Sequence, residues 1–356
     1  MNLIDTLVIG AGQSGLATAH ALRKHGIEPV VLEAGDAPTG SWPHYYDSLT
    51  LFSPAHYSSL PGMPFPGDPD RYPHRDEVIA YLTAYAARLD ADIRTGHRVA
   101  TVEHHEGIYT AHLIDGRVLH ARTVVAATGG FTNPYSPALP GLATFPGTVL
   151  HAADYQRPEP FTGQRVLVVG GGNSAVQIAT ELAAHAQVTL TTRSKLRFAP
   201  QRPLGRDLHF WYTITGLDTA PIGHWLTHPP IVPVLDTGRY RRAIEAGRPD
   251  HQSMFTVLEG DRVYWSGGAS ERVDALILAT GYRPALDYLT GLNVLTPEGH
   301  PRHQGGLATN LPGLAFVGLE WQHSLSSASI RGVGRDAARI ARPLAAMVLN
   351  SRKEIG

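Results

Sequence analysis

Residues 7–15 read LVIGAGQSG, and this short stretch decides the fold of the chain. An apolar run leads directly into Gly10, Gly12 and Gly15. Glycine lets the backbone N–H groups at the start of a helix approach the pyrophosphate of a dinucleotide closely. Glu33 ends the next apolar run, 18 residues after Gly15, where a carboxylate can accept hydrogen bonds from the adenosine ribose. Because this carboxylate repels a 2′-phosphate, we predict FAD or NAD here rather than NADP.

A second stretch of the same kind begins at residue 166 and reads VLVVGGGNSA. Alanine in place of the third glycine is an accepted variant of the pattern. The strand that follows ends in Thr192, Arg193 and Ser194, where the first copy has an acid. A guanidinium group with neighbouring hydroxyls suits a 2′-phosphate, so we predict that this site prefers NADPH to NADH. A solvent-exposed arginine without a ligand is the alternative reading.

The sequence around these two stretches extends them into domains. Residues 98–126 alternate in period two around two turn signals, which predicts a three-stranded antiparallel meander. Two further apolar strands each end in Ala-Thr-Gly, at residues 127–129 and 279–281, and are predicted to close the two units. The predicted fold class is α/β, with two Rossmann-like dinucleotide-binding domains of the FAD/NAD(P)-linked reductase type.

The two domains are expected to share the chain unequally. The FAD-binding domain takes residues 1–160 and 282–356, and the NADPH-binding domain of residues 161–281 is inserted into it. A closing helix is expected from about residue 326 to 349, with interruptions at Gly332, Gly334 and Pro343. Residues 197–248 show no clear period, so their structure is not predicted.

The composition excludes several classes of function. Thirty Lys and Arg residues against 31 Asp and Glu give a net charge of −1, so no bulk field attracts nucleic acid or an anionic membrane. The absence of cysteine excludes disulfides, thiolate metal sites and a redox-active cysteine pair. The 19 histidines show no metal-ligand spacing, so no metal is predicted. No stretch approaches the ~18 apolar residues of a membrane span, and no leader pattern is found, so we expect a cytoplasmic protein.

Two dinucleotide sites in one chain imply hydride transfer from a nicotinamide to a flavin. Without a cysteine pair, the electrons would then pass to molecular oxygen, to a diffusible acceptor such as a quinone, or to a protein partner. A hydrolase is disfavoured, because Leu16 and Val176 occupy the place of the last glycine of the G-x-S-x-G pattern.

One motif favours oxygen as the acceptor. Residues 145–155 read FPGTVLHAADY and match the pattern F-x-G-x-x-x-H-x-x-x-Y of class B flavin-containing monooxygenases. Together with the FAD and NADPH stretches on either side, this motif makes the chain resemble the short bacterial branch of that family. The branch is related to plant and animal flavin monooxygenases and, more distantly, to Baeyer-Villiger monooxygenases. The alternative is that residues 145–155 are an interdomain linker.

The resemblance implies an NADPH-dependent flavin monooxygenase. NADPH would reduce FAD, O2 would form a peroxyflavin, and one oxygen atom would pass to a small soft nucleophile such as a sulfide, amine or ketone. The remaining alternatives are an FAD-dependent NAD(P)H reductase or oxidase that passes electrons to a quinone or O2, and a non-catalytic flavin-binding sensor or partner protein. A homodimer is possible.

The resemblance also assigns residues. His151 would be a hinge and cofactor-positioning residue, and it forms the predicted catalytic set with Phe52 and Tyr155. Phe52 stands where animal relatives place an Asn, so a hydrogen bond is lost and release of peroxide is expected. The predicted cofactor-binding residues are Gly10, Gly12, Gln13, Ser14, Gly15, Glu33, Gly40, Ser41, Trp42, Val99, Ala127, Thr128, Gly129, Gly170, Gly172, Asn173, Ser174, Thr192, Arg193, Ser194, Ala279, Thr280, Gly281, Gly318, Trp321 and Gln322.

Overall fold

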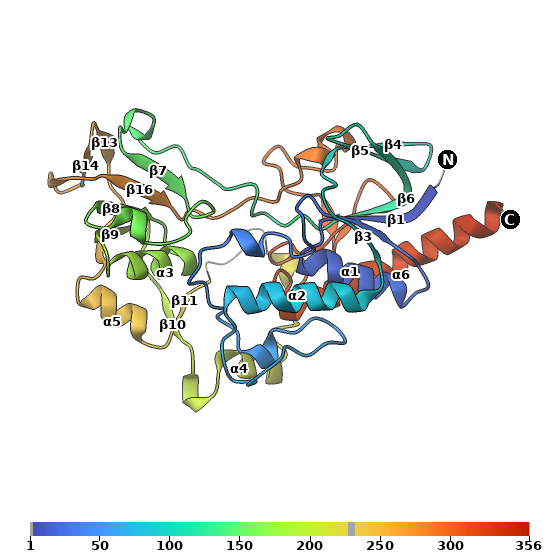
Figure 1. The fold of residues 1–356 in the computed structure, drawn as a ribbon, viewed down its shortest axis with the longest axis horizontal. Helices are drawn as coiled ribbons and strands as arrows, with labels where there is room; N and C mark the ends of the chain where they lie inside the picture. Colours follow the sequence, from blue (N-terminus) through green and yellow to red (C-terminus); the bar gives the residue numbers. More distant parts are fainter. Residues whose placement is uncertain (1–2, 227–231, 356) are drawn as a thin grey trace.

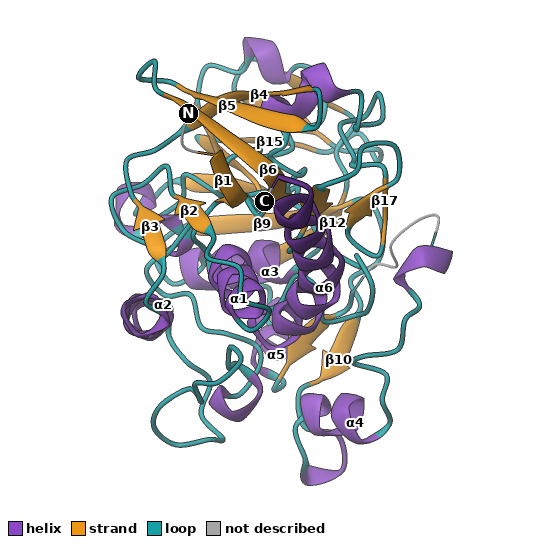
Figure 2. Ribbon diagram, turned by 90° about the vertical axis from the view of Figure 1, so that its right-hand side faces the viewer, coloured by secondary structure: helices purple, strands orange, loops and turns teal. Residues whose placement is uncertain are grey.

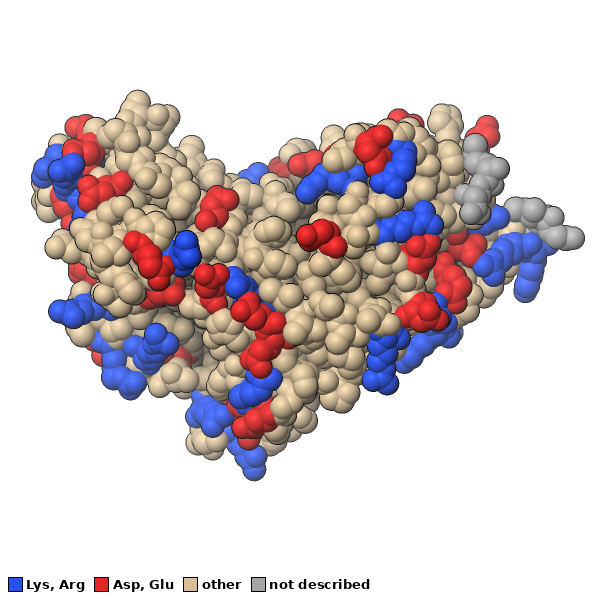
Figure 3. Space-filling view, in the orientation of Figure 1, with Lys and Arg blue, Asp and Glu red and all other residues tan. Residues whose placement is uncertain are grey.

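The computed structural model describes residues 3–226 and 232–355. Its two largest sheets, of nine and five strands, form two lobes joined by extended connections (Figure 1). Both sheets are built around parallel strands with helices packed on them, which confirms the predicted α/β fold class. Lys and Arg side chains are interspersed with Asp and Glu on the face in Figure 3, so this face carries no large patch of a single charge.

The first sheet contains the first glycine stretch. Its strands are, in spatial order, β17 (His303–Gln304), β18 (Leu307–Ala308), β19 (Leu314–Phe316), β6 (Val118–Ala126), β1 (Leu3–Ile9), β2 (Val30–Leu32) and β3 (Asp92–Arg94). Two further strands, β4 (Val99–His105) and β5 (Ile108–Leu113), pair antiparallel with each other, and β5 pairs with β6. This arrangement confirms the predicted three-stranded meander.

Helices cover one face of this sheet and the meander covers the other. Alternation along β1 sends Val8 into the core below α1 (Gln13–Arg23), α2 (Arg75–Leu89) and α6 (Ile330–Ile355). Leu7 and Ile9 point the opposite way, into the core shared with the meander. Seen end-on in Figure 2, α1 and α6 lie side by side. The start of α1 is thereby held between the sheet and α6.

The expected interruptions of the closing helix are wrong, because α6 is continuous from Ile330 to Ile355. Its glycines serve close packing. A Cβ on Gly332 would lie 2.0 Å from the Ser326 carbonyl oxygen, and one on Gly334 would lie 2.3 Å from the Pro61 ring. Pro343 also lies inside the helix and does not end it. Within the described residues, no helix is long and apolar enough to cross a membrane.

The second lobe repeats the plan of the first. Its parallel strands are, in spatial order, β12 (Asp250–Ser253), β9 (Gln187–Thr192), β8 (Arg165–Val169), β16 (Ala275–Leu278) and β7 (Thr148–His151). One face of β8 packs with α3 (Asn173–Leu182), and α5 (Arg239–Glu245) lies on the same side. The other face belongs to a core that includes Val263 of the antiparallel sheet β13 (Val257–Glu259), β14 (Arg262–Tyr264) and β15 (Ser270–Arg272). Because β7 pairs with β16, the second sheet includes residues before the predicted boundary at 160, and the division of the chain into domains stays a prediction.

The segment without a sequence pattern forms short elements, of which the first two pack on the core of the second lobe. They are the parallel pair β10 (Phe198–Pro200) and β11 (Val234–Asp236), and the helix α4 (Leu208–Ile214), which lies at the bottom of Figure 1. Short 3-10 segments complete the described elements at η1 (Trp42–His44), η2 (Ala55–Tyr57), η3 (Leu142–Thr144), η4 (Glu159–Phe161), η5 (Pro203–Gly205), η6 (Gly223–Trp225) and η7 (Asp287–Leu292). Irregular backbone of this kind produces no regular spacing of apolar residues, so the sequence does not predict it.

Candidate functional site

Two glycine turns lie at the carboxyl ends of β1 and β8, and both have the same construction. Gly10 has a φ of +103°, and a Cβ on it would lie 2.6 Å from the carbonyl oxygen of Ala127. Gly170 has a φ of +147°, and a Cβ on it would lie 2.2 Å from the carbonyl oxygen of Ala279. Each turn therefore lies directly against one of the two Ala-Thr-Gly segments, in a conformation that favours glycine.

The helix that follows each turn begins without a side-chain cap. The N-caps of α1 and α3 are Gly12 and Gly172, and neither provides a side-chain hydrogen bond. A Cβ on Gly12 would have only the Cα of Gly40 within 4 Å, and one on Gly172 would have no heavy atom that close. The first N–H groups of both helices are thus available to an anionic group such as a pyrophosphate.

Glu33 is held beside the first turn. It is buried, and its Oε2 accepts a hydrogen bond of 2.8 Å from the N–H of Ala11, within the turn. Its Oε1 accepts a second bond of 2.9 Å from the N–H of Gly35. A carboxylate has about four lone-pair sites, so acceptor capacity remains for ribose hydroxyls. Glu33, the residue predicted to bind the ribose, therefore lies at the glycine turn.

Three segments distant in sequence meet at the start of α1. The indole N–H of Trp42 donates to Gln13 Oε1 at 2.7 Å, and Gln13 Nε2 donates to the carbonyl of Ala328 at 3.3 Å. The loop before η1, which contains Ser41, approaches the turn closely, because a Cβ on Gly40 would lie 2.8 Å from the Cα of Gly12. These predicted cofactor residues are thus brought together.

The loop between β19 and α6 also reaches this point. A Cβ on Gly318 would lie 2.2 Å from the hydroxyl oxygen of Ser14. The buried amide of Gln322 donates to the carbonyl of Phe316 at 2.8 Å, so this side chain fixes its own loop. Trp321 adopts a φ of +55° in the same loop. Val99, in contrast, packs on the core between the sheet and the meander.

The second turn lies beside the end of β9. A Cβ on Gly171 would lie 3.6 Å from Thr192 Cγ2, and Thr192 Oγ1 is 2.9 Å from Nε2 of His251. Arg193 and Ser194 follow and are exposed. An exposed guanidinium next to a glycine turn is where a 2′-phosphate could be bound.

Other predicted residues at the two turns have structural contacts of their own. Thr128 Oγ1 donates to the carbonyl of Ala285 at 2.7 Å, and Thr280 Oγ1 donates to the carbonyl of Tyr135. Asn173 Oδ1 accepts from the N–H of Leu235 at 3.2 Å and so connects α3 to β11. Ser174, Gly129 and Gly281 lie in the same segments. These contacts stabilise the walls of the two turns.

His151 lies at the end of β7, next to the strand that leads to Gly281. It is buried, and its Nδ1 accepts a hydrogen bond of 3.1 Å from the N–H of Ala153. Burial lowers the pKa of His151, and the nearby Gly281 backbone, which makes no hydrogen bond of normal geometry with Nε2, opposes this shift. The imidazole is therefore neutral with its proton on Nε2, an atom that has no hydrogen-bond partner among the described residues. It can donate a hydrogen bond to a ligand.

The other two predicted catalytic residues have different contacts from those of His151. Tyr155 is completely buried, and its hydroxyl donates to Glu181 Oε2 at 2.8 Å, so its position indicates a packing role. Burial, with the carboxylate of Glu181, raises its pKa. Phe52 is 43% exposed, and its ring stacks near His209 at 6.2 Å between centroids. None of the contacts described for the three residues joins them into one catalytic group.

Sequence reasoning missed a buried carboxylate next to Phe52. Asp207 accepts hydrogen bonds from His209 Nδ1 at 2.7 Å, Tyr72 Oη at 2.6 Å and Gln201 Nε2 at 2.9 Å. Burial opposes ionisation, but these bonds outweigh it and lower the pKa of Asp207 to about 2. The Gln201 amide also donates to the carbonyl of Phe52 at 3.0 Å. The available signal was an Asp directly before a short helical run, which is typical of an N-cap.

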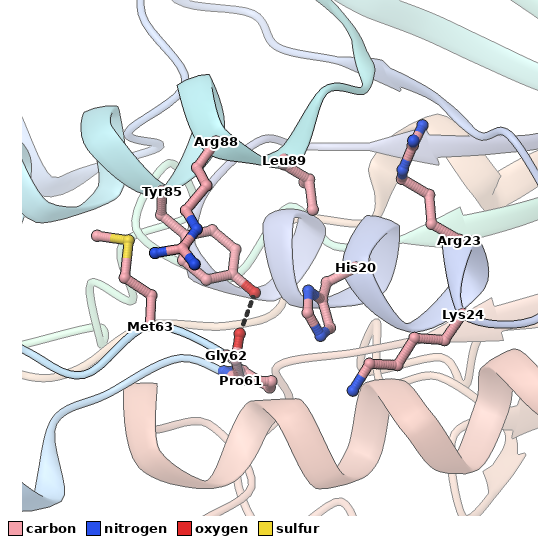
Figure 4. A pocket seen from close by; sticks show the side chains of 9 residues that line it. All are labelled: His20, Arg23, Lys24, Pro61, Gly62, Met63, Tyr85, Arg88 and Leu89. Atoms are coloured by element: carbon pink, nitrogen blue, oxygen red, sulfur yellow. Dashed lines mark hydrogen bonds between the residues drawn. The ribbon is translucent and has the colours of Figure 1, made fainter.

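A separate cavity of about 370 Å³ lies at the far end of α1 (Figure 4). Its lining residues are His20, Arg23, Lys24, Pro61, Gly62, Met63, Tyr85, Arg88 and Leu89. The basic side chains suit the negative carboxyl ends of α1 and α2. Along α1, His20 is the lining residue nearest to the glycine turn, and it lies seven residues, ~10 Å, beyond Gln13; none of the turn residues lines the cavity, so it is not the dinucleotide site. Among the described residues, no group of three or more His, Cys, Asp and Glu is arranged to hold a metal ion.

Two such turns, each at the carboxyl end of a parallel strand in its own sheet, are typical of oxidoreductases that bind two dinucleotides. Residues 7–211 match the model of the pyridine nucleotide-disulphide oxidoreductase family. The chain belongs to this family and, within it, to the flavin monooxygenases, which use FAD and NADPH.

Similar proteins with high coverage support this assignment. A flavin-containing monooxygenase from Stenotrophomonas maltophilia superposes with a TM-score of 0.86 at 33% identity, over 97% of this chain and 99% of that one. An uncharacterized CzcO-like oxidoreductase of Geobacillus kaustophilus is 33% identical, over 94% of this chain and 97% of its own. Indole-3-pyruvate monooxygenase YUCCA1 of rice, Oryza sativa subsp. japonica, is 33% identical, over 78% of this chain and 76% of its own.

Proposed function

We propose that this chain is an NADPH-dependent monooxygenase for a small molecule, either a nucleophile such as a sulfide or an amine, or a ketone. NADPH supplies two electrons, one oxygen atom of O2 passes to the substrate, and the other leaves as water. The observation that carries the proposal is the pair of uncapped glycine turns, one beside Glu33 and the other beside Thr192, the residue before Arg193. Because the chain has no cysteine, it cannot send the electrons out through a thiol pair of its own.

Charge assigns a cofactor to each turn. The buried carboxylate of Glu33 would accept hydrogen bonds from the adenosine ribose of FAD, and it would repel the 2′-phosphate of NADPH. At the second turn, Thr192, Arg193 and Ser194 would bind that phosphate. The N–H groups at the starts of α1 and α3 would bind the two pyrophosphates. The redox chemistry comes from the bound flavin and nicotinamide, and the chain supplies binding, orientation and exclusion of water.

His151 is proposed to orient a bound cofactor. Its buried Nε2 has no hydrogen-bond partner among the residues that the structure describes, so a cofactor acceptor would satisfy the proton that it carries. Because its pKa is lowered by burial, the imidazole stays neutral near pH 7 and keeps this proton. His151 would therefore act as a fixed donor and would not transfer a proton.

One experiment separates this proposal from its alternatives. Purified protein loaded with FAD is mixed with NADPH, O2 and a simple thioether, and NADPH consumed, sulfoxide formed and hydrogen peroxide released are all measured. Sulfoxide in a substantial ratio to NADPH supports the monooxygenase. NADPH consumption without sulfoxide, whether it yields peroxide or is accelerated by an added quinone, indicates the reductase or oxidase. No consumption of NADPH, together with no bleaching of the flavin when NADPH is added in the absence of O2, indicates the non-catalytic binding protein.

The oxidase remains a second candidate because of Phe52. The half-exposed ring of Phe52 has no hydrogen-bond donor, whereas the Asn that animal relatives place here has an amide N–H. If the missing donor causes peroxide release, Phe52→Asn will raise the yield of sulfoxide per NADPH. An unchanged yield would remove Phe52 as the cause.

A further inference from the structure

The first turn of α6 carries a positive charge where a helix favours a negative one. Arg331 is the second residue of α6, and the first turn contains no acidic residue. The N-terminus of a helix behaves as roughly half a positive charge, so a cation there is unfavourable unless an anion compensates it. The compensating anion must therefore come from another part of the chain.

Asp218, which follows α4, supplies this anion. It is 2% exposed, and its Oδ1 accepts from Nε and Nη2 of Arg331 at 3.0 and 2.9 Å. Its Oδ2 is 3.4 Å from Nη1 of Arg335. The Arg331 side chain is itself only 11% exposed, so both charges depend on each other for stabilisation.

Backbone contacts fix Asp218 in this position. The hydroxyl of Ser326 donates to the carbonyl of Asp218 at 2.8 Å, and the N–H of Gly223 donates to the carbonyl of His323 at 2.9 Å. A Cβ on Gly223 would lie 1.9 Å from the carbonyl oxygen of Trp321, so only glycine permits this approach. The segment after α4 is thus packed on the loop that leads into α6.

This end of α6 adjoins the first glycine turn. Gln13, in the first turn of α1, donates to the carbonyl of Ala328, two residues before α6 begins. Ser14 touches Gly318 in the loop that Asp218 helps to hold. With the pyrophosphate of FAD bound at the start of α1 as proposed, the rest of the same FAD molecule lies within reach of a net charge on Arg331, because the protein interior screens charge less than water does.

We propose that Asp218 is a positioning residue that cancels the charge of Arg331 beside the FAD site and so sets how readily the bound FAD is reduced. The inference rests on the proposed binding of FAD at the first turn. Reduction places negative charge on the flavin, and an uncompensated positive charge nearby stabilises that state. Asp218→Asn will therefore raise the reduction potential, and Arg331→Gln will lower it.

The test is an anaerobic dye-equilibrium titration of the FAD-loaded enzyme and its variants. We expect each single change to alter the equilibrium between reduced and oxidised flavin by about tenfold, which is about 30 mV for a two-electron couple. The two shifts have opposite signs, and the double variant returns close to the parent. A purely structural role would move both single variants in the same direction.

The matched control lies at the other end of the same helix. Asp5 pairs there with Arg352 and Arg122, and its side chain is 15% exposed. Asp5→Asn should leave the potential unchanged. Shifts of the same sign in Asp218→Asn and Arg331→Gln, or no shift in either, overturn the inference. If Asp218→Asn does not fold, Arg331→Gln tests the inference instead. Its reduction potential should be lower than that of the parent, and Arg331→Lys should restore the parental value. If the parent binds no FAD, the flavin absorbance shows this first, and the proposed function fails instead.

Discussion

The carboxylate of Asp207 is buried and nevertheless ionised, because it accepts hydrogen bonds from three side chains. These bonds lower its pKa to about 2, against ~3.9 for an unperturbed aspartate. A pKa that is lower in the folded state stabilises the fold at every pH above the unfolded value. The contribution, about 2 kcal/mol, is lost as the pH falls from about 4 towards 2.

We therefore predict that Asp207→Asn lowers the free energy of unfolding by about 2 kcal/mol at pH 7. The difference from the parent should shrink as the pH falls below about 4, because the parent carboxylate is then protonated in the unfolded chain. Urea denaturation at a series of pH values measures this. Asp68→Asn is the control, since Asp68 is exposed and accepts only a local bond from Asp70. A loss that stays constant down to pH 3 would contradict the assigned pKa.

Arg193 permits a second prediction at the scale of a single side chain. A charge-assisted hydrogen bond is worth about 1.5–3 kcal/mol, so Arg193→Gln should lower kcat/KM for NADPH roughly 10- to 100-fold and leave NADH almost unaffected. Lys195→Gln, two residues further along the same exposed segment, tests whether any lost positive charge has this effect. Equal losses with both nicotinamides would show that Arg193 does not bind the 2′-phosphate.

At the scale of an element, the glycine turn of β1 and α1 is the most tightly constrained feature. A Cβ on Gly15 would lie 1.8 Å from the backbone oxygen of Gly10, and a backbone atom cannot move aside as a side chain can. The second turn has Ala175 in the corresponding place and a Gly170 with a wider φ. The two turns are therefore similar in sequence but not interchangeable in packing.

Gly15→Ala should consequently destabilise the protein by about 2 kcal/mol or more and weaken FAD binding. Thermal unfolding and the flavin content of the purified protein measure the two effects. Gly291→Ala is a suitable comparison, because an added Cβ there meets no heavy atom within 4 Å. Full flavin content in Gly15→Ala would indicate that the turn can widen and that the constraint is weaker than its geometry implies.

The elements that the sequence predicted are those whose shape follows from local chemistry. Glycines 10 and 15 and the acid at Glu33 reflect requirements within one strand, turn and helix, and the structure brings them together. The prediction of interruptions in α6 was wrong because Gly334 is required for close packing against Pro61, a residue distant in the sequence. Tyr155 and Asp207 show the same limit, since only tertiary packing decides that one is a core residue and the other a buried anion.

At the scale of the whole molecule, the two lobes are joined by two connections that are hydrogen-bonded to each other. The N–H of Tyr135 donates to the carbonyl of Gly281, and the N–H of Ala285 donates to the carbonyl of Gly129, both at 2.8–2.9 Å. Asn133 adds a side-chain bond to the carbonyl of Pro284. Both Ala-Thr-Gly segments thus end in the same double connection, so a movement of one lobe is transmitted to the wall of both glycine turns.

His151 is the last residue of β7 and lies beside the end of β16, where the second connection leaves the second sheet. The ring centroids of His151 and Tyr282, which belongs to that connection, are 5.1 Å apart in an edge-on arrangement. We predict that His151→Phe keeps the ring packing and most of the NADPH oxidation but lowers the product formed per NADPH several-fold, because the buried Nε2–H donor is lost. His151→Gln retains an N–H donor and should lose less. Since burial keeps the imidazole neutral, the coupling of the parent should not change as the pH rises above 7. Measuring product, peroxide and NADPH together checks this prediction. If His151→Phe forms as much product per NADPH as the parent, His151 has only a packing role.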